Sequence, residues 1–108
     1  MSLQQDPQKI LEHAKLMRER AQNEITRVRV EASTGGGMVT VRMDGNKRVL
    51  GIVIEPDAVE DIEMLQDMVR GAVNEAVRRA EAEAQQRVDR MMGGLVGRLG
   101  FPFSLAGG

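Results

Sequence analysis

The fold is decided by residues 27–54, which read RVRVEASTGGGMVTVRMDGNKRVLGIVI. In residues 28–32 apolar and polar side chains alternate, which is typical of a half-buried strand. After three consecutive glycines the alternation returns in residues 38–43, and after an Asp-Gly-Asn turn a third strand is predicted over residues 47–54, which are apolar from Val49 to Ile54 except for Gly51. The segment therefore predicts three antiparallel strands joined by tight turns, which together form a β-meander.

A helix is predicted before the meander, over about residues 7–26. Asp6 followed by Pro7 is a common start signal, because aspartate caps a helix and proline suits its first turn. From Ile10 to Ile25 an apolar residue recurs every three or four positions. The narrow apolar stripe that results is typical of a helix packed along another one.

A much longer helix is predicted after the meander. Pro56 ends the third strand, since proline removes a hydrogen-bond donor from the sheet. The segment from about residue 58 to residue 92 contains no proline and carries a second apolar stripe from Leu65 to Ala80. We expect the two glycines at 93–94 to end this helix. The predicted fold class is α+β, with the element order α-β-β-β-α.

Length and composition favour one domain that forms a homodimer. The chain has 108 residues, no cysteine and only 2% aromatic residues, so a single copy has a small core and no disulfide to support it. The long helix would span about 50 Å, whereas a compact domain of this size is about 35 Å across. We place the domain at residues 1–92 and expect residues 93–108, which are rich in glycine, to form a flexible tail.

The net charge of −1 hides an uneven distribution. Residues 55–67 hold six acidic and no basic residues, so the remaining residues carry fifteen bases against ten acids, a net charge of +5. The acidic block falls at the start of the long helix, where carboxylates interact favourably with the helix dipole. It lacks the alternating ligands and the turn glycine of a calcium loop, so we do not expect a metal site there.

No set of residues indicates catalysis. The single histidine, His13, lies on the polar side of the first helix, and the serines fall in termini or a turn. Glycines 35–37 lack the lysine of a phosphate-binding loop and lie between two strands, so we interpret them as a hairpin tip. We therefore expect a protein that is not an enzyme and has no cofactor, catalytic residue, metal or small-molecule substrate.

The basic residues allow two interpretations. Arginine suits phosphate, because its planar guanidinium donates two hydrogen bonds and keeps its charge. Pairs such as Glu75–Arg79 and Glu83–Arg87 also fit a simpler picture of solvated helix faces with intrahelical ion pairs. The scarcity of aromatic side chains disfavours single-stranded nucleic acid and leaves the duplex backbone as the nucleic-acid target. Spacing alone leaves both interpretations open.

The order of several short segments resembles the YbaB/EbfC family of nucleoid-associated proteins. Over residues 8–92 the matching segments are GGGMVTV at 35–41, Gly45, IVIEP at 52–56, EMLQDMV at 63–69 and AVNEA at 72–76. The resemblance implies a tweezer-like homodimer with projecting helices, which associates with the bacterial chromosome and is not an enzyme. It also implies that DNA is contacted by basic residues of those helices, here Lys9, Lys15, Arg18, Arg20, Arg78, Arg79, Arg87 and Arg90.

Our leading hypothesis is a homodimer that binds double-stranded DNA mainly through its phosphate backbone and affects chromosome organisation and gene expression. The alternative is a dimeric protein-binding scaffold or adaptor without physiological DNA binding. The N-terminus lacks the features of a secretory signal, and no apolar run approaches the roughly 20 residues that cross a bilayer. We therefore expect a cytoplasmic protein that associates with the nucleoid and not with a membrane.

Overall fold

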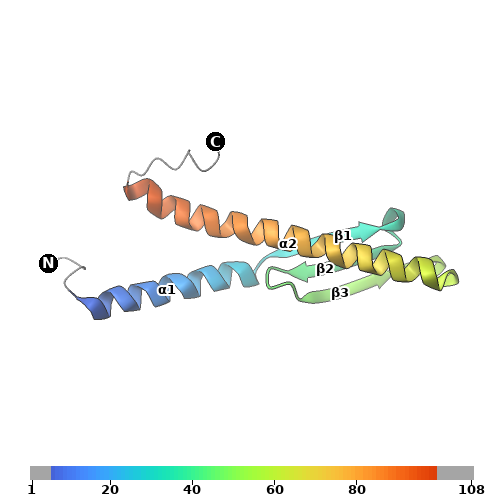
Figure 1. Cartoon of the computed structure of the whole chain (residues 1–108), viewed down its shortest axis with the longest axis horizontal. Helices are drawn as coiled ribbons and strands as arrows, with labels where there is room; N and C mark the ends of the chain where they lie inside the picture. The colour runs from blue at the N-terminus through green and yellow to red at the C-terminus, as the bar shows by residue number, and fades with distance from the viewer. Residues whose placement is uncertain (1–5, 100–108) are drawn as a thin grey trace.

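The computed structural model describes the backbone of residues 6–99 and the side chains of residues 6–93. It has the predicted α-β-β-β-α order (Figure 1). The elements are α1 (Pro7–Thr26), β1 (Arg29–Thr34), β2 (Val39–Asp44), β3 (Val49–Ile54), the short 3-10 helix η3 (Pro56–Glu60) and α2 (Ile62–Leu99).

α1 begins where the sequence indicates and stands almost clear of the sheet. The Asp6 carboxylate accepts hydrogen bonds from the backbone N–H groups of Gln8 and Lys9, at 3.1 and 3.3 Å, and so satisfies two donors of the first turn. No residue of α1 is buried. Val28, two residues after the end of α1, is fully buried and fixes the chain before β1 begins.

The sheet is an antiparallel meander with the order β1-β2-β3. Ala32 pairs with Val41, and Val41 pairs with Ile52 on its other side. The β1–β2 connection is the predicted hairpin tip: all three of its glycines have positive φ values, which side-chain-bearing residues rarely adopt. The Thr34 hydroxyl donates a 2.7 Å hydrogen bond to the Met68 carbonyl and ties this tip to α2.

The core lies between α2 and the first two strands. Ala72, Ala76 and Ala80 of α2 are fully buried, and they form one cluster with apolar side chains of β2, among them Val39 and Val41. Alanines let the helix backbone approach the sheet closely, because they place only a methyl group in the interface. β3 forms the outer edge of the sheet, and its side chains remain largely exposed.

α2 starts later and ends later than the sequence pattern predicts. Residues 56–60 form η3, and the Asp61 carboxylate then caps α2 by accepting a 3.1 Å hydrogen bond from the Met64 N–H. The predicted end at glycines 93–94 is wrong, because α2 continues to Leu99. Glycine weakens a helix by about 1 kcal/mol but lacks the steric block of proline. The rest of the predicted tail, residues 100–108, lies outside the described residues.

The molecule is elongated. Its radius of gyration is 20.0 Å, against about 13 Å for a compact domain of this length. α1 and α2 extend past the same end of the sheet and diverge from each other (Figure 1). We call these projecting parts of α1 and α2 the arms.

Gly45→Ala is expected to destabilise the protein by about 2–3 kcal/mol. A Cβ at this buried turn position would collide with the carbonyl oxygen of Ile25, so the turn would have to move away from α1. The control is Gly93→Ala, because Gly93 lies in α2 and its added methyl would meet nothing within 4 Å beyond the adjoining backbone of its own helix. Alanine there is expected to stabilise the protein by up to about 1 kcal/mol. Urea unfolding measures both effects, and equal stability of Gly45→Ala and the wild type would contradict the packing described for this turn.

Candidate nucleic-acid interface

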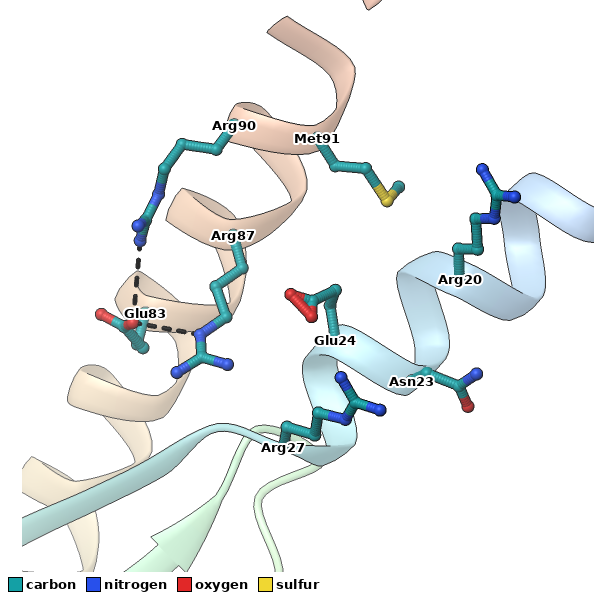
Figure 2. Close-up of a pocket in the computed structure, with 8 residues that line it drawn as sticks. All are labelled: Arg20, Asn23, Glu24, Arg27, Glu83, Arg87, Arg90 and Met91. Carbon is teal, nitrogen blue, oxygen red and sulfur yellow. Dashed lines mark hydrogen bonds and ion pairs between the residues drawn. The ribbon is translucent and has the colours of Figure 1, made fainter. Parts of the chain in front are cut away.

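A cationic hollow lies between the two arms, close to the point where they begin to diverge. We call it the notch (Figure 2). It has a volume of about 750 Å³ and opens to solvent. The lining residues are Arg20, Asn23, Glu24 and Arg27 on the α1 side, and Glu83, Arg87, Arg90 and Met91 on the α2 side. Four guanidinium groups against two carboxylates give the notch a charge of +2, whereas the whole chain carries −1.

The α2 side of the notch is organised by one carboxylate. The Arg87 Nε donates a 3.2 Å hydrogen bond to Oε1 of Glu83, and Nη2 of Arg90 lies 3.8 Å from the same oxygen (Figure 2). The Arg87 side chain is only 31% exposed, whereas that of Arg90 is 70% exposed. Arg87 is therefore held in place by its surroundings, whereas the exposed Arg90 has only a weak 3.4 Å hydrogen bond from its Nε to the Gln86 carbonyl and the 3.8 Å ion pair.

The α1 side of the notch follows from helical spacing. Arg20, Glu24 and Arg27 are four and three residues apart, which brings them to one side of α1 and of the turn that ends it. Glu24 reaches toward α2 (Figure 2). None of the ion pairs among the described residues involves these three side chains. The two guanidinium groups on this side therefore keep their hydrogen-bonding capacity for a ligand.

The structure separates the eight predicted DNA contacts into three groups. Arg20, Arg87 and Arg90 meet in the notch. The remaining α1 residues, Lys9, Lys15 and Arg18, lie exposed along the arm and do not line the notch. Arg78 and Arg79 lie on the part of α2 that covers the sheet.

Arg78 and Arg79 share one carboxylate outside the notch. Arg78 contacts Oε1 of Glu75 at 2.6 Å, and Arg79 contacts Oε2 at 3.2 Å and also donates to the Glu31 carbonyl. The hydrogen bonds from Arg78 and Arg79 lower the pKa of Glu75 below its usual value, so this carboxylate keeps its charge at neutral and mildly acidic pH. The ion pairs of this cluster are therefore present above the ordinary glutamate pKa and are lost only as the pH falls through the lowered one.

Arg27 is the lining residue that the sequence-based selection of DNA contacts missed. In the sequence, Arg27 precedes the alternating residues 28–32 and so looked like an outward-facing residue of the first strand. In the structure it lies directly after the last residue of α1, before β1 begins. The signal that could have found it is the seven-residue spacing from Arg20, which is two helical turns.

The notch suits anion binding. Guanidinium groups bind phosphate through paired, charge-assisted hydrogen bonds, and the lining residues include no serine, threonine, cysteine or histidine as a nucleophile or base. Among the described residues no group of three carboxylate, histidine or cysteine side chains could hold a metal ion. Within the same residues, no helix has the length and hydropathy needed to cross a membrane.

These features define an elongated helix–meander–helix protein with a cationic notch at the base of two projecting helices. The model of the YbaB/EbfC DNA-binding family matches residues 4–95. The chain belongs to this family.

Individual relatives agree with this assignment. The chain is 42% identical over 95 residues to a nucleoid-associated protein of Acidobacterium capsulatum, with 82% of this chain and 88% of the relative covered. It is 35% identical over 112 residues to a nucleoid-associated protein of Legionella pneumophila, with coverage of 100% and 96%. The crystal structure of an uncharacterized protein from Helicobacter pylori has the same fold, with a TM-score of 0.62, 22% identity and coverage of 76% of this chain and 98% of that one.

Proposed function

We propose that the protein binds double-stranded DNA mainly through the phosphate backbone, as a homodimer associated with the nucleoid in the cytoplasm, and that it has no enzymatic activity. The observation that carries the proposal is the meeting of Arg20, Arg27, Arg87 and Arg90 in one open notch. Membership of a DNA-binding family supports DNA as the polyanion. Through such binding the protein would affect chromosome organisation and gene expression.

Recognition of the backbone fits the side chains that the arms offer. Arginine and lysine neutralise phosphates without reading base edges. α1 has 20 residues and is about 30 Å long, and duplex DNA carries about one charge per 1.7 Å of axis, so about 18 phosphates lie along such a length. The basic residues of α1 that lie outside the notch, Lys9, Lys15 and Arg18, would therefore find phosphates at almost any register.

The homodimer is supported by the apolar surface of β3. Its residues are apolar on both faces. Ile52 lies on the same face of the sheet as its buried partner Val41, yet it is 45% exposed because α2 packs mainly on β1 and β2. An edge strand of this kind is usually covered in an assembly. Exposed Ile62 and Met64 at the start of α2 extend the apolar surface. We propose that a second copy covers β3 and the start of α2.

This dimer would leave both notches accessible. The start of α2 lies at the opposite end of the molecule from the arms (Figure 1). Two copies joined there would therefore present their arms outward, and one duplex could contact a notch on each copy. Two linked sites bind a common ligand more tightly than either site does alone.

The proposed function is tested by gel-shift titration of the protein against several duplexes of unrelated sequence at low salt. All of them are expected to shift at similar protein concentrations, because phosphate contacts carry no direct sequence information. If no duplex shifts even at low salt, the protein does not act by binding DNA. A shift confined to one sequence would instead indicate readout of the bases.

The second candidate function, a protein-binding scaffold, is favoured by one observation. Ile10, Leu11 and Leu16 are 44–57% exposed on the α1 arm, where an apolar partner could cover them. Capture of partners from a lysate treated with nuclease separates the two functions. A protein partner retained after this treatment, together with an absence of gel shifts, would favour the scaffold, and recovery that disappears with the nucleic acid would favour DNA binding.

A further inference from the structure

The Glu83 carboxylate contacts both arginines on the α2 side of the notch. Arg87 and Arg90 lie on successive turns of α2, and their guanidinium groups are 3.2 and 3.8 Å from the same carboxylate oxygen of Glu83. Two guanidinium groups directed at one anionic oxygen are also the arrangement with which arginines bind a phosphate. The α2 side of the notch therefore carries its own anion.

We propose that Glu83 is an internal competitor of DNA, which holds Arg87 and Arg90 in the DNA-free protein and limits the affinity for duplex. This inference rests on the proposed function, because the competing ligand is a backbone phosphate. A phosphodiester and a carboxylate each carry one negative charge on two terminal oxygens, so a phosphate entering the notch takes the place of Glu83, which accepts a hydrogen bond from Arg87 and forms an ion pair with Arg90. Arg90 turns from Glu83 to the phosphate at little steric cost, since its side chain is 70% exposed.

The competitor has two physical consequences. It keeps Arg87 extended along α2 when DNA is absent, so the guanidinium is already positioned when DNA arrives. It also lowers the charge that the notch presents, so that each phosphate is bound less tightly and is released more easily. A protein that must bind many sequences and still leave them gains from both effects.

A matched control lies two turns earlier in α2. Glu75 also pairs with two arginines, Arg78 and Arg79, but it lies outside the notch. Glu75→Gln and Glu83→Gln remove the same charge from the same helix with nearly the same side-chain shape. A difference in DNA affinity between the two variants therefore reflects the position of Glu83 in the notch and not the net charge of the protein.

The test is an affinity titration of both variants and the wild type against one duplex at several salt concentrations. Glu83→Gln is expected to raise the affinity about three- to ten-fold and to steepen the logarithmic salt dependence by about one, because a released arginine neutralises a further phosphate. Glu75→Gln is expected to change the affinity less than two-fold. In a background of Arg87→Ala with Arg90→Ala, the gain from Glu83→Gln should fall below about two-fold, since the arginines that it releases are gone and only the loss of one negative charge remains.

Three results would overturn this inference. Equal gains from Glu83→Gln and Glu75→Gln would show that only net charge matters. An unchanged or lower affinity of Glu83→Gln, with the helix content of the wild type by circular dichroism, would show that Glu83 does not compete with phosphate, while binding by the wild type would leave the proposed function standing. Absence of duplex binding by the wild type itself would remove both proposals.

Discussion

Replacing both Arg87 and Arg90 with alanine is expected to lower the affinity for duplex DNA about 30- to 100-fold, to the same extent on unrelated sequences. The two guanidinium groups form the α2 side of the notch, and hydrogen bonds to charged groups contribute about 1.5–3 kcal/mol each. The exposure of Arg90 reduces its share, so a total loss of about 2–3 kcal/mol is expected, which corresponds to that range of affinity. Their removal also leaves Glu83 without partners, as an unneutralised charge facing the phosphates.

The matched variant is Arg78→Ala with Arg79→Ala. It removes the same charge from α2, but both guanidinium groups are engaged by Glu75 and lie outside the notch, so the expected loss is below about ten-fold. Fluorescence anisotropy with two unrelated labelled duplexes measures both double variants. A greater loss from the Arg78 and Arg79 pair, or a loss confined to one duplex, would contradict the notch as the main phosphate site.

Ile52→Asp is expected to convert the proposed homodimer to a monomer and to reduce DNA affinity more than about 100-fold. In a two-fold assembly the substitution places two carboxylates against an apolar surface, and an uncompensated charge buried in an interface costs about 3–5 kcal/mol. A monomer has one notch in place of two and so loses the gain from linked sites. Light scattering after size exclusion measures the mass, which is expected to fall to the 11.9 kDa of one chain.

The control for Ile52→Asp is Ile10→Asp. Both isoleucines are 45% exposed, but Ile10 lies on the arm, away from the proposed interface, so this variant should remain a dimer. Loss of folding is not expected in either variant, because both side chains are already half exposed within one copy. A wild type that is monomeric, or an Ile52→Asp variant that remains dimeric, would contradict the proposed interface.

The sequence was sufficient for the order of the elements, because each one follows from local patterns. The alternation in residues 28–32 and 38–43 and the cap formed by Asp6 act over a few residues and do not depend on distant partners. The ends of α2 were predicted less well. At its start, residues 56–60 form η3 in place of a first turn of α2, and at its end the helix continues through glycines 93–94. Both outcomes depend on small differences in free energy, which a pattern of apolar residues does not resolve.

The notch could not be predicted, because it depends on where two helices converge. Arg20 and Arg87 are 67 positions apart, and no local pattern relates them. Sequence spacing placed Arg79 four residues after Glu75 and Arg87 four residues after Glu83, and the structure has both ion pairs. Only the tertiary arrangement shows that the second pair faces another basic helix and the first does not.

The central claim, that phosphate contacts dominate binding, is tested most directly by the salt dependence of the affinity. The dissociation constant of the wild-type protein would be measured on two unrelated duplexes between about 50 and 200 mM salt. Contacts from two notches and the neighbouring basic residues predict a log–log slope of about −4 or steeper, which is the value for at least four neutralised phosphates, and the same slope on both duplexes. A slope near zero, or strong binding to only one of the two duplexes, would contradict the account.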